Sequence, residues 1–309
     1  MKVLVTGGAG FIGSNIVKEL LNQNHDVVVI DNLSTGNLDN LQDVMDKIKF
    51  VEGDITNLDT MMDACKDVDY VLHQAAIASV PRSIEDPFSS NKNNIDGTLN
   101  VLYAAKESGV KRVVYAGSSS AYGNSTEEYK NESINPEVLS PYAGTKLMGE
   151  YYCKIFSSVY RLETVSLRYF NVFGPSQDPD SEYSAVIPLF IKSILDDKSP
   201  TVHGDGTQSR DFTYVANNVK ANILAMTSDK VGSGEIINIA CGKSYSLLEL
   251  IDSINKILNK NIESNFIESR AGDVKNSLAD IKKAKELLGY EPEIDFLEGL
   301  EKTIEFYKK

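Results

Sequence analysis

Cysteine and histidine are scarce in this sequence, with three of each among 309 residues. Cys65, Cys153 and Cys241 are scattered and form no C-x-x-C pair, so we expect no disulfide framework and a protein of a reducing compartment. The three histidines lie far apart and lack the i, i+4 spacing of helical metal ligands. The sequence therefore predicts neither a structural nor a catalytic metal site.

Long hydrophobic runs and an excess of positive charge are also missing. No run of about 18 apolar residues is present, and the short N-terminal apolar run leads directly into glycines. We therefore expect a cytoplasmic protein with neither a membrane span nor a signal peptide. The formal charge of −13 argues against nucleic acid and anionic membranes as partners. With 42% hydrophobic residues, the chain can bury a large core in one large or two modest domains.

A glycine-rich turn near the start organises the rest of the chain. An apolar run at 3–5 predicts a buried strand, and helical spacing begins at Phe11. Between them lie Gly7, Gly10 and Gly13 in a G-x-x-G-x-x-G pattern. Glycines let the backbone approach a pyrophosphate, and the N–H groups at a helix N-terminus attract it. This turn predicts a dinucleotide cradle.

Asp31 follows a second apolar run, eighteen residues beyond Gly13. A carboxylate at this place can accept hydrogen bonds from both ribose hydroxyls of adenosine. Its charge would repel a 2′-phosphate, so we expect NAD rather than NADP. The alternative is that Asp31 is a solvated residue in the turn 31–36.

The first half of the chain alternates short apolar runs with helical patterns. Such alternation predicts an α/β fold, a Rossmann-type doubly wound parallel sheet with helices on both faces. The expected strands are 2–6, 26–30, 48–51, 69–72, 111–116 and 163–168, and the expected helices are 11–22, 57–65, 89–108 and 142–160.

Beyond residue 174 the loops become rich in Ser, Asp, Gly and Pro. Helical patterns recur at 187–196, 215–228, 246–258, 280–287 and 296–307, and a strand at 235–240 is expected to return to the sheet. We predict an NAD-binding domain over 1–174, joined by the segment 211–240. Residues 175–309 are expected to form a smaller, mainly substrate-binding α/β region.

A tyrosine and a lysine at helical spacing carry the expected chemistry. Tyr142 and Lys146 are four residues apart and share one helix face. A neighbouring ammonium should lower the pKa of the phenol toward working pH and make it a general acid/base. Ser118 or Ser119, at a strand end about 24 residues upstream, should hydrogen-bond the substrate hydroxyl. The alternative is an exposed tyrosine beside a surface lysine.

Together these motifs resemble the UDP-glucose 4-epimerase family of extended short-chain dehydrogenases/reductases. The matching stretches are TGGAGFIGS at 6–14, DNLSTG at 31–36, GDI at 53–55, HQAA at 73–76, NNIDGT at 93–98, SSSAYG at 118–123, SPYAGTK at 140–146, LRYFNVFGP at 167–175, SRDF at 209–212 and RAGD at 270–273. The resemblance implies a tightly held NAD and an isomerase that oxidises the sugar at C4. The resulting 4-keto sugar would turn over and be reduced on its other face.

The resemblance and the strand-end positions together assign roles to individual residues. Lys146 would also hold the nicotinamide ribose, and Tyr169 would flank the nicotinamide. The expected cofactor contacts are Gly7, Gly10, Phe11, Ile12, Gly13, Asp31, Asn32, Ser34, Thr35, Gly36, Asp54, Ile55, Gln74, Ala75, Ala76, Asn94, Tyr142, Lys146 and Tyr169. The expected substrate contacts are Ser79, Arg82, Ser118, Tyr142, Asn171, Arg210, Arg270, Asp273 and Ser277.

The choice of sugar rests on one position. In the family, the residue seven places after the arginine of R-x-G-D gates the space beside the 2-substituent, and a tyrosine there restricts N-acetyl sugars. This chain has Ser277 at that place. We therefore expect turnover of UDP-glucose and UDP-galactose and of UDP-GlcNAc and UDP-GalNAc. A departure is Ala78, where some members have a lysine near the cofactor.

Three other functions share this fold. A 4,6-dehydratase needs an Asp-Glu pair after the strand-end Ser, but Ser119 and Ser120 follow Ser118 here. A UDP-glucuronate epimerase or decarboxylase needs a basic pocket, which the sequence leaves open. A non-catalytic NAD sensor would not need the pair of Tyr142 and Lys146.

The family resemblance also implies a homodimer formed through the helices 89–108 and 142–160. Its candidate contacts are Leu99, Leu102, Tyr103, Leu147, Tyr151 and Ile155, unless these side chains pack on the sheet.

Overall fold

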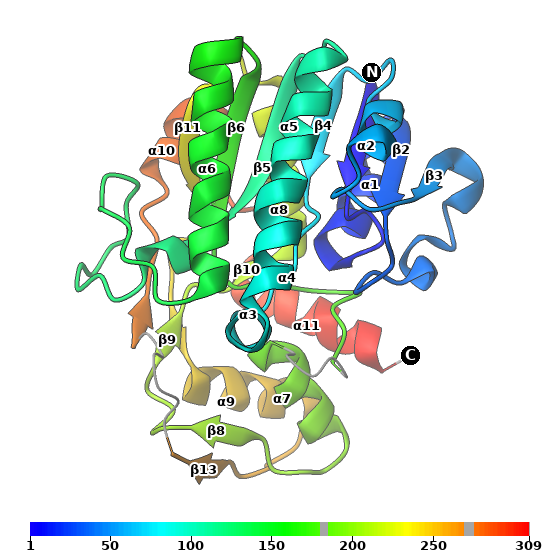
Figure 1. The fold of residues 1–309 in the computed structure, drawn as a ribbon. Coiled ribbons are helices and arrows are strands. Elements are labelled where there is room, and N and C mark those ends of the chain that lie inside the picture. The colour runs from blue at the N-terminus through cyan, green and yellow to red at the C-terminus, as the bar shows by residue number, and fades with distance from the viewer. Residues whose placement is uncertain (180–184, 269–274, 309) are drawn as a thin grey trace.

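A seven-stranded parallel sheet forms the centre of the protein, in the order β11-β6-β5-β4-β1-β2-β3 (Figure 1). The computed structural model describes residues 1–179, 185–268 and 275–308. The strands are β1 (Lys2–Thr6), β2 (Asp26–Asp31), β3 (Ile48–Glu52), β4 (Tyr70–His73), β5 (Arg112–Ser118), β6 (Glu163–Tyr169) and β11 (Ser233–Ile239). The doubly wound fold expected from the sequence is confirmed.

Helices cover both faces of the sheet because successive strand residues point to opposite sides. In β1, Leu4 packs into one buried cluster, and Val3 and Val5 pack into another. The Leu4 side carries α2 (Leu58–Ala64), α5 (Gly97–Glu107) and α6 (Pro141–Tyr160). The opposite side carries α1 (Phe11–Asn22) and α8 (Val215–Thr227). Figure 1 shows α5 and α6 side by side in front of the sheet.

The helix predicted over 89–108 is confirmed as unbroken helical backbone over 87–107. It comprises α4 (Pro87–Asn91), a π-helical turn (Lys92–Asp96) and α5, and a separate short helix, α3 (Val80–Glu85), precedes it. The hydroxyl of Ser79 caps the backbone N–H of Arg82 and starts α3. The π turn contains Asn94, whose amide bonds to both backbone groups of Ile77. A π turn inserts one residue into a helix, so it shifts the 3.6-residue pattern without ending the helix.

A C-terminal lobe, which we define as α7 (Val186–Leu195), α9 (Leu247–Leu258) and the short strands near them, lies below the sheet in Figure 1. The short strands are β7 (Val172–Phe173), β8 (Thr201–His203), β9 (Ser209–Arg210), β10 (Thr213–Tyr214), β12 (Tyr245–Ser246), β13 (Asn265–Ile267) and β14 (Asn276–Ser277). They pair as β10-β7, β12-β9-β14 and β13-β8. Strands of two or three residues are too short to show a period in the sequence.

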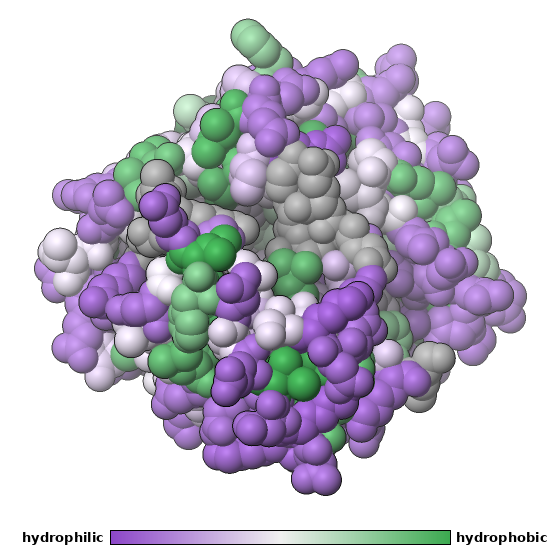
Figure 2. Space-filling view, turned by 90° about the horizontal axis from the view of Figure 1, so that it is seen from below, coloured by the Kyte–Doolittle hydropathy of each residue, from purple (hydrophilic) through white to green (hydrophobic). Residues whose placement is uncertain are grey.

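The lobe and the sheet share one hydrophobic core. Ile191 of α7 and Leu250 of α9 belong to the same buried cluster as Val5 of β1. The remaining elements are α10 (Lys282–Leu288), α11 (Phe296–Tyr307) and the 3-10 turns Leu38–Leu41, Met45–Lys47 and Ser119–Tyr122. Seen from the lobe, the surface is mainly hydrophilic with small hydrophobic areas (Figure 2). None of the helices in the described residues is long and apolar enough to cross a membrane.

A buried ion pair joins α6 to β6 behind the strand ends. Arg168 donates from Nε and from its second terminal nitrogen to the two carboxylate oxygens of Glu150, at 2.8 and 2.7 Å. The two side chains are 2% and 0% exposed. The guanidinium also lies over the ring of Tyr122, 4.7 Å from its centroid. Burying a charge is unfavourable, and each of these two charges compensates the other. Removing either partner would leave the other charge buried without compensation.

Replacing Glu150 by Ala should lower the free energy of unfolding by about 3 to 5 kcal/mol, because Arg168 would stay buried without a counter-charge. Urea unfolding of both proteins measures the difference. The matched control is Asp252→Ala, which breaks the exposed pair of Asp252 with Lys256 on α9 and should cost less than about 1 kcal/mol. Equal losses in the free energy of unfolding of the two variants would contradict the stabilising role of the buried ion pair.

Candidate active site

A cleft of about 1240 Å³ opens at the carboxyl ends of the sheet strands. Its walls come from the turn after β1, from the ends of β2, β4, β5 and β6, from α6 and from the C-terminal lobe. A doubly wound sheet binds its ligands at this edge. A site for one small ligand is commonly about 300 to 1,000 Å³, so the cleft is large enough for two.

The glycine turn brings backbone against backbone at one end of the cleft. Gly7 has φ of +66°, and a Cβ there would lie 2.7 Å from the backbone of Ala75. A Cβ on Gly13 would lie 2.1 Å from the carbonyl oxygen of Gly7, so only glycine fits. No side chain caps α1 at Gly10, and its first turn holds no acidic residue. The first N–H groups of the helix therefore suit an anion.

Asp31 is held in place at the end of β2. Its carboxylate accepts the backbone N–H of Ala9 at 2.9 Å and that of Leu33 at 2.8 Å. The residue is 8% exposed and lines the cleft. Carboxylate and glycine turn thus have the arrangement that fits the adenosine ribose and the pyrophosphate of a dinucleotide.

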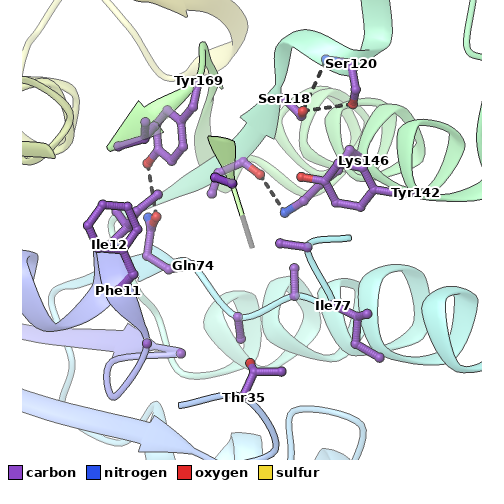
Figure 3. A pocket seen from close by; sticks show the side chains of 18 of the residues that line it. Phe11, Ile12, Thr35, Gln74, Ile77, Ser118, Ser120, Tyr142, Lys146 and Tyr169 are labelled. Atoms are coloured by element: carbon purple, nitrogen blue, oxygen red, sulfur yellow. Dashed lines mark hydrogen bonds between the residues drawn. The ribbon is translucent and has the colours of Figure 1, made fainter. Parts of the chain in front are cut away.

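Tyr142, Lys146 and Ser118 meet on the opposite wall of the cleft (Figure 3). The hydroxyl of Ser140 and Pro141 start α6, and the backbone N–H of Tyr142 bonds to Ser83 at 3.0 Å. Lys146 is 4% exposed, and its ammonium donates to the carbonyl of Ala116 at 2.9 Å.

The pKa values here differ from the sequence-based expectation. Burial raises the pKa of Tyr142 above its usual value, and a hydrogen bond with Ser118 opposes the rise. Burial lowers the pKa of Lys146 to about 8, which Glu150 opposes. The expectation that Lys146 lowers the phenol pKa is therefore wrong for the protein alone, because the lysine itself is buried and its ammonium bonds to a backbone carbonyl.

Among the three serines after β5, Ser118 and Ser120 interact. Ser118 Oγ accepts the backbone N–H of Ser120 at 3.2 Å and the hydroxyl of Ser120 at 2.8 Å (Figure 3). Ser119 also lines the cleft, but within the described residues it does not bond to this pair. The sequence singled out Ser118 and Ser119 and missed the bonded partner, because a run of three serines does not tell which hydroxyls face each other.

Tyr169 and Gln74 line the cleft on its other side (Figure 3). The hydroxyl of Tyr169 donates to Gln74 at 3.1 Å, and the amide of Asn222 donates to Tyr169 at 2.7 Å. Asn222 comes from α8, is fully buried and also accepts from Gln74 at 3.1 Å. The sequence missed Asn222, since an asparagine within an unremarkable helix carries no signal of its own.

Most predicted contacts line the cleft. They are Gly7, Gly10, Phe11, Ile12, Gly13, Asp31, Asn32, Ser34, Thr35, Ile55, Gln74, Ala75, Ala76, Ser118, Ser119, Tyr142, Lys146, Tyr169, Asn171, Arg210 and Ser277. Arg270 and Asp273 lie outside the described residues.

Five predicted contacts do not line the cleft: Gly36, Asp54, Asn94, Ser79 and Arg82. Three of them support residues that do. A Cβ on Gly36 would lie 2.9 Å from both carboxylate oxygens of Asp31. Asp54 accepts from Asn32 at 2.9 Å, and Asn94 holds the loop at Ile77. Ser79 caps α3, and Arg82 lies within that helix.

The far end of the cleft is assembled by Asp211, which the sequence missed. Its carboxylate is fully buried and accepts the backbone N–H groups of Cys241, Gly242 and Ala279 at 3.0, 3.0 and 3.3 Å. Burial raises its pKa to about 7, against the effect of these three donors. Asp211 also donates its backbone N–H to Ser277 at 2.8 Å. This network holds β14 beside β9, whose Arg210 lines the cleft.

Comparison with known proteins now identifies the family. Residues 3–240 match the model of the NAD dependent epimerase/dehydratase family. The chain belongs to this family. A putative UDP-glucose 4-epimerase of Methanocaldococcus jannaschii is 42% identical over 99% of this chain and 98% of the relative. The cofactor of this family member is NAD, as expected from Asp31 and the glycine turn.

Solved structures of relatives cover the same length. The UDP-N-acetylglucosamine 4-epimerase from Methanobrevibacter ruminantium, in complex with UDP-N-acetylmuramic acid, is 43% identical with a TM-score of 0.95, covering 99% of this chain and 98% of that one. The UDP-glucuronic acid 4-epimerase from Bacillus cereus, in complex with UDP-glucuronic acid and NAD, is 37% identical with a TM-score of 0.93, covering 100% and 99%. Nucleotide-sugar epimerases acting on different sugars thus share this fold.

Lys146→Met should stabilise the NAD-free protein at pH 7 by about 1 to 3 kcal/mol, because it removes a buried ammonium. The pKa of Lys146 is about 8 in the folded protein against 10.5 in the unfolded chain. The wild type therefore gains stability as pH rises from 8 to 10.5, and the advantage of the variant should shrink over that range.

Urea unfolding at pH 7 and pH 9.5 measures this difference. Lys66→Met, at an exposed lysine, is the matched control and should not show this gain in stability at pH 7 that shrinks at pH 9.5. A loss of stability in Lys146→Met that is equal at both pH values would contradict the prediction.

Proposed function

We propose that the protein is a UDP-hexose 4-epimerase that interconverts UDP-glucose with UDP-galactose and UDP-GlcNAc with UDP-GalNAc through a 4-keto sugar. The observation that carries the proposal is the position of Tyr142 and Ser118 on the wall facing the glycine turn. Two hydroxyls beside a dinucleotide site can remove and return the proton of one sugar hydroxyl. The relatives named above support a reaction at C4 of a nucleotide sugar.

Tyr142 is the proposed acid/base. Its ionised form, the phenolate, takes the proton of the 4-hydroxyl as the 4-keto sugar forms, and the resulting phenol returns that proton after the sugar has turned over. Ser118 donates a hydrogen bond that steadies the sugar oxygen or the phenolate. NAD, when bound, supplies the acceptor and the donor of the hydride. Arg210 lies in the C-terminal part of the cleft, where a guanidinium suits the diphosphate and leaves the sugar free to turn.

The cations of the cleft favour a neutral sugar over a uronate. Among the lining residues that the structure describes, the cations are Lys130, Lys146 and Arg210. The ammonium of Lys130 donates to the carbonyls of Ser125, at 2.7 Å, and of Glu127. The ammonium of Lys146 donates to Ala116. With Arg210 assigned to the diphosphate, these contacts support UDP-hexoses over UDP-glucuronate.

Purified protein without added cofactor should convert UDP-galactose and UDP-GalNAc to their 4-epimers, because bound NAD is regenerated in each cycle. Chromatography of the products measures the conversion. Tyr142→Phe should lose at least about 100-fold in kcat, the loss expected on removing a general acid/base. Full activity of this variant, or conversion of UDP-glucuronate alone, would contradict the proposal.

Ser277→Tyr tests the proposed gate at the sugar. Ser277 lines the cleft from β14, and its small side chain leaves space for a 2-acetamido group. The variant should lose activity on UDP-GalNAc at least about tenfold while UDP-galactose turnover is retained, since one misplaced bulky group costs more than about 1.4 kcal/mol. Ser277→Ala is the matched control and should retain both activities. Parallel losses on both sugars in Ser277→Tyr would argue against the gate.

We also propose a homodimer formed by α5 and α6. Met148, Tyr151, Ile155 and Val159 form an apolar stripe along α6 and are 40 to 64% exposed, and Tyr103 on the neighbouring α5 is 44% exposed. Such a stripe on two adjacent helices suits a matching surface of a second copy. Of the candidate contacts, Leu102 is fully buried in the core, so the alternative of packing on the sheet holds for this residue.

Sedimentation should give twice the chain mass of 34.0 kDa for the wild type. Ile155→Glu places a charge in the centre of the stripe and should give the single-chain mass. Leu297→Glu is the matched control, because Leu297 is 50% exposed on α11, away from the stripe, and it should leave the mass unchanged. A wild type of single-chain mass would overturn the proposed dimer.

A further inference from the structure

Ser118 accepts two hydrogen bonds, so its hydroxyl can act toward a third group only as a donor. A serine hydroxyl offers two acceptor lone pairs and one donor. Ser118 Oγ accepts both the backbone N–H and the hydroxyl of Ser120, at 3.2 and 2.8 Å. Both acceptor positions are therefore filled, and the proton of Ser118 has to be donated to another group.

The turn that carries Ser120 is fixed by the backbone. Ser118 ends β5 and caps the 3-10 turn Ser119–Tyr122. Gly123 ends the turn with φ of +48°, and a Cβ there would lie 1.7 Å from the carbonyl oxygen of Glu137. The backbone of Glu137 in turn donates to Ala121 at 3.1 Å. The place of Ser120 relative to Ser118 is therefore set before any ligand binds.

The Tyr142 phenol lies near Ser118, whose hydroxyl lowers the pKa of the phenol against the effect of burial. The two side chains come from β5 and α6 and point into the same part of the cleft (Figure 3). An ionised phenol oxygen accepts hydrogen bonds and donates none. A serine that can only donate favours the ionised phenol, whereas a serine with a free lone pair can also accept from the neutral phenol.

We propose that Ser120 is a positioning residue that directs the hydroxyl proton of Ser118 toward the oxygen of Tyr142. The proposal rests on the acid/base role of Tyr142 proposed above and deepens it. The chain of donors runs from the hydroxyl of Ser120 to Ser118 and from there to Tyr142. Each hydrogen bond polarises the next, so the hydroxyl of Ser120 also makes Ser118 a better donor.

Other titratable groups near Tyr142 remain in place when Ser120 is changed. Lys146 on α6 donates to Ala116, and Tyr115 on β5 donates to the carbonyl of Lys146 at 3.3 Å. His73 on β4 bonds to Thr6 and Thr98 at 2.7 and 3.0 Å. In the described part of the chain, none of these groups bonds to Ser120. A change at Ser120 therefore reaches Tyr142 through Ser118.

Ser120→Ala tests the proposal by the ionisation of Tyr142. The loss of one hydroxyl frees a lone pair on Ser118, so the ionised phenol loses support and the midpoint should rise by about 0.5 to 1 pH unit. Ultraviolet difference titration, with Tyr142→Phe subtracted in each background, measures the midpoint without any turnover. The acid limb of kcat against pH should shift in the same direction, with kcat about three- to tenfold lower at pH 7, while the affinity for UDP stays unchanged.

Two further variants distinguish a role of the Ser120 hydroxyl in orienting Ser118 from a general effect of substitution on the fold. Ser120→Thr keeps a hydroxyl and should restore the wild-type midpoint. Ser253→Ala removes a hydroxyl from α9, far from the cleft, and should leave the midpoint unchanged. A Ser120→Ala midpoint equal to that of the wild type, or an equal shift in Ser120→Thr, would overturn the proposal. If the wild type turned over no UDP-hexose, the proposed substrate would fail, but the titration would still decide the role of Ser120.

Discussion

The contact between Gly13 and the carbonyl of Gly7 is the constraint on which the site depends. A Cβ at Gly13 would lie 2.1 Å from that oxygen, so α1 can approach the end of β1 only because a side chain is missing. The approach points the uncapped N-terminus of α1 into the cleft. It also places Gly7 against the backbone of Ala75, after β4. One backbone contact thus aligns two walls of the cleft.

Stability and catalysis make opposite demands on α6. Lys146 is buried with a lowered pKa, and Glu150 one turn later is held by Arg168. An ammonium in this position is unfavourable for folding, and it lies on the wall to which we assign the acid/base chemistry. The buried pair of Glu150 and Arg168 places a carboxylate on the same helix face, which favours the charged form of Lys146. The buried Glu150 therefore offsets part of the unfavourable effect of burying the Lys146 ammonium.

The sequence predicted the parts of the fold that have a strong period. The sheet strands and the long helices agree with the structure because buried positions repeat every two or 3.6 residues. The π turn at Lys92–Asp96 and strands as short as β9 were not predicted, since one inserted residue or two paired residues leave no period.

Within the site, Gly13, Asp31 and Tyr142 could be predicted from local spacing. Asp211 and Asn222 could not, because their partners lie far away in the chain. Asn94 was predicted to contact the cofactor, but it does not line the cleft. It accepts the backbone N–H of Ile77 and so holds a loop that does line the cleft.

The way β14 is held has a consequence for how such enzymes diverge. Its backbone is fixed by Asp211, through the N–H of Ala279 and the carbonyl of Ser277, and by the bond of Ser209 to Lys275. None of these bonds uses the side chain of Ser277. Mutation can therefore exchange that side chain without disturbing the strand that carries it. If Ser277 gates the sugar as proposed, sugar preference can change among relatives at little risk to the fold.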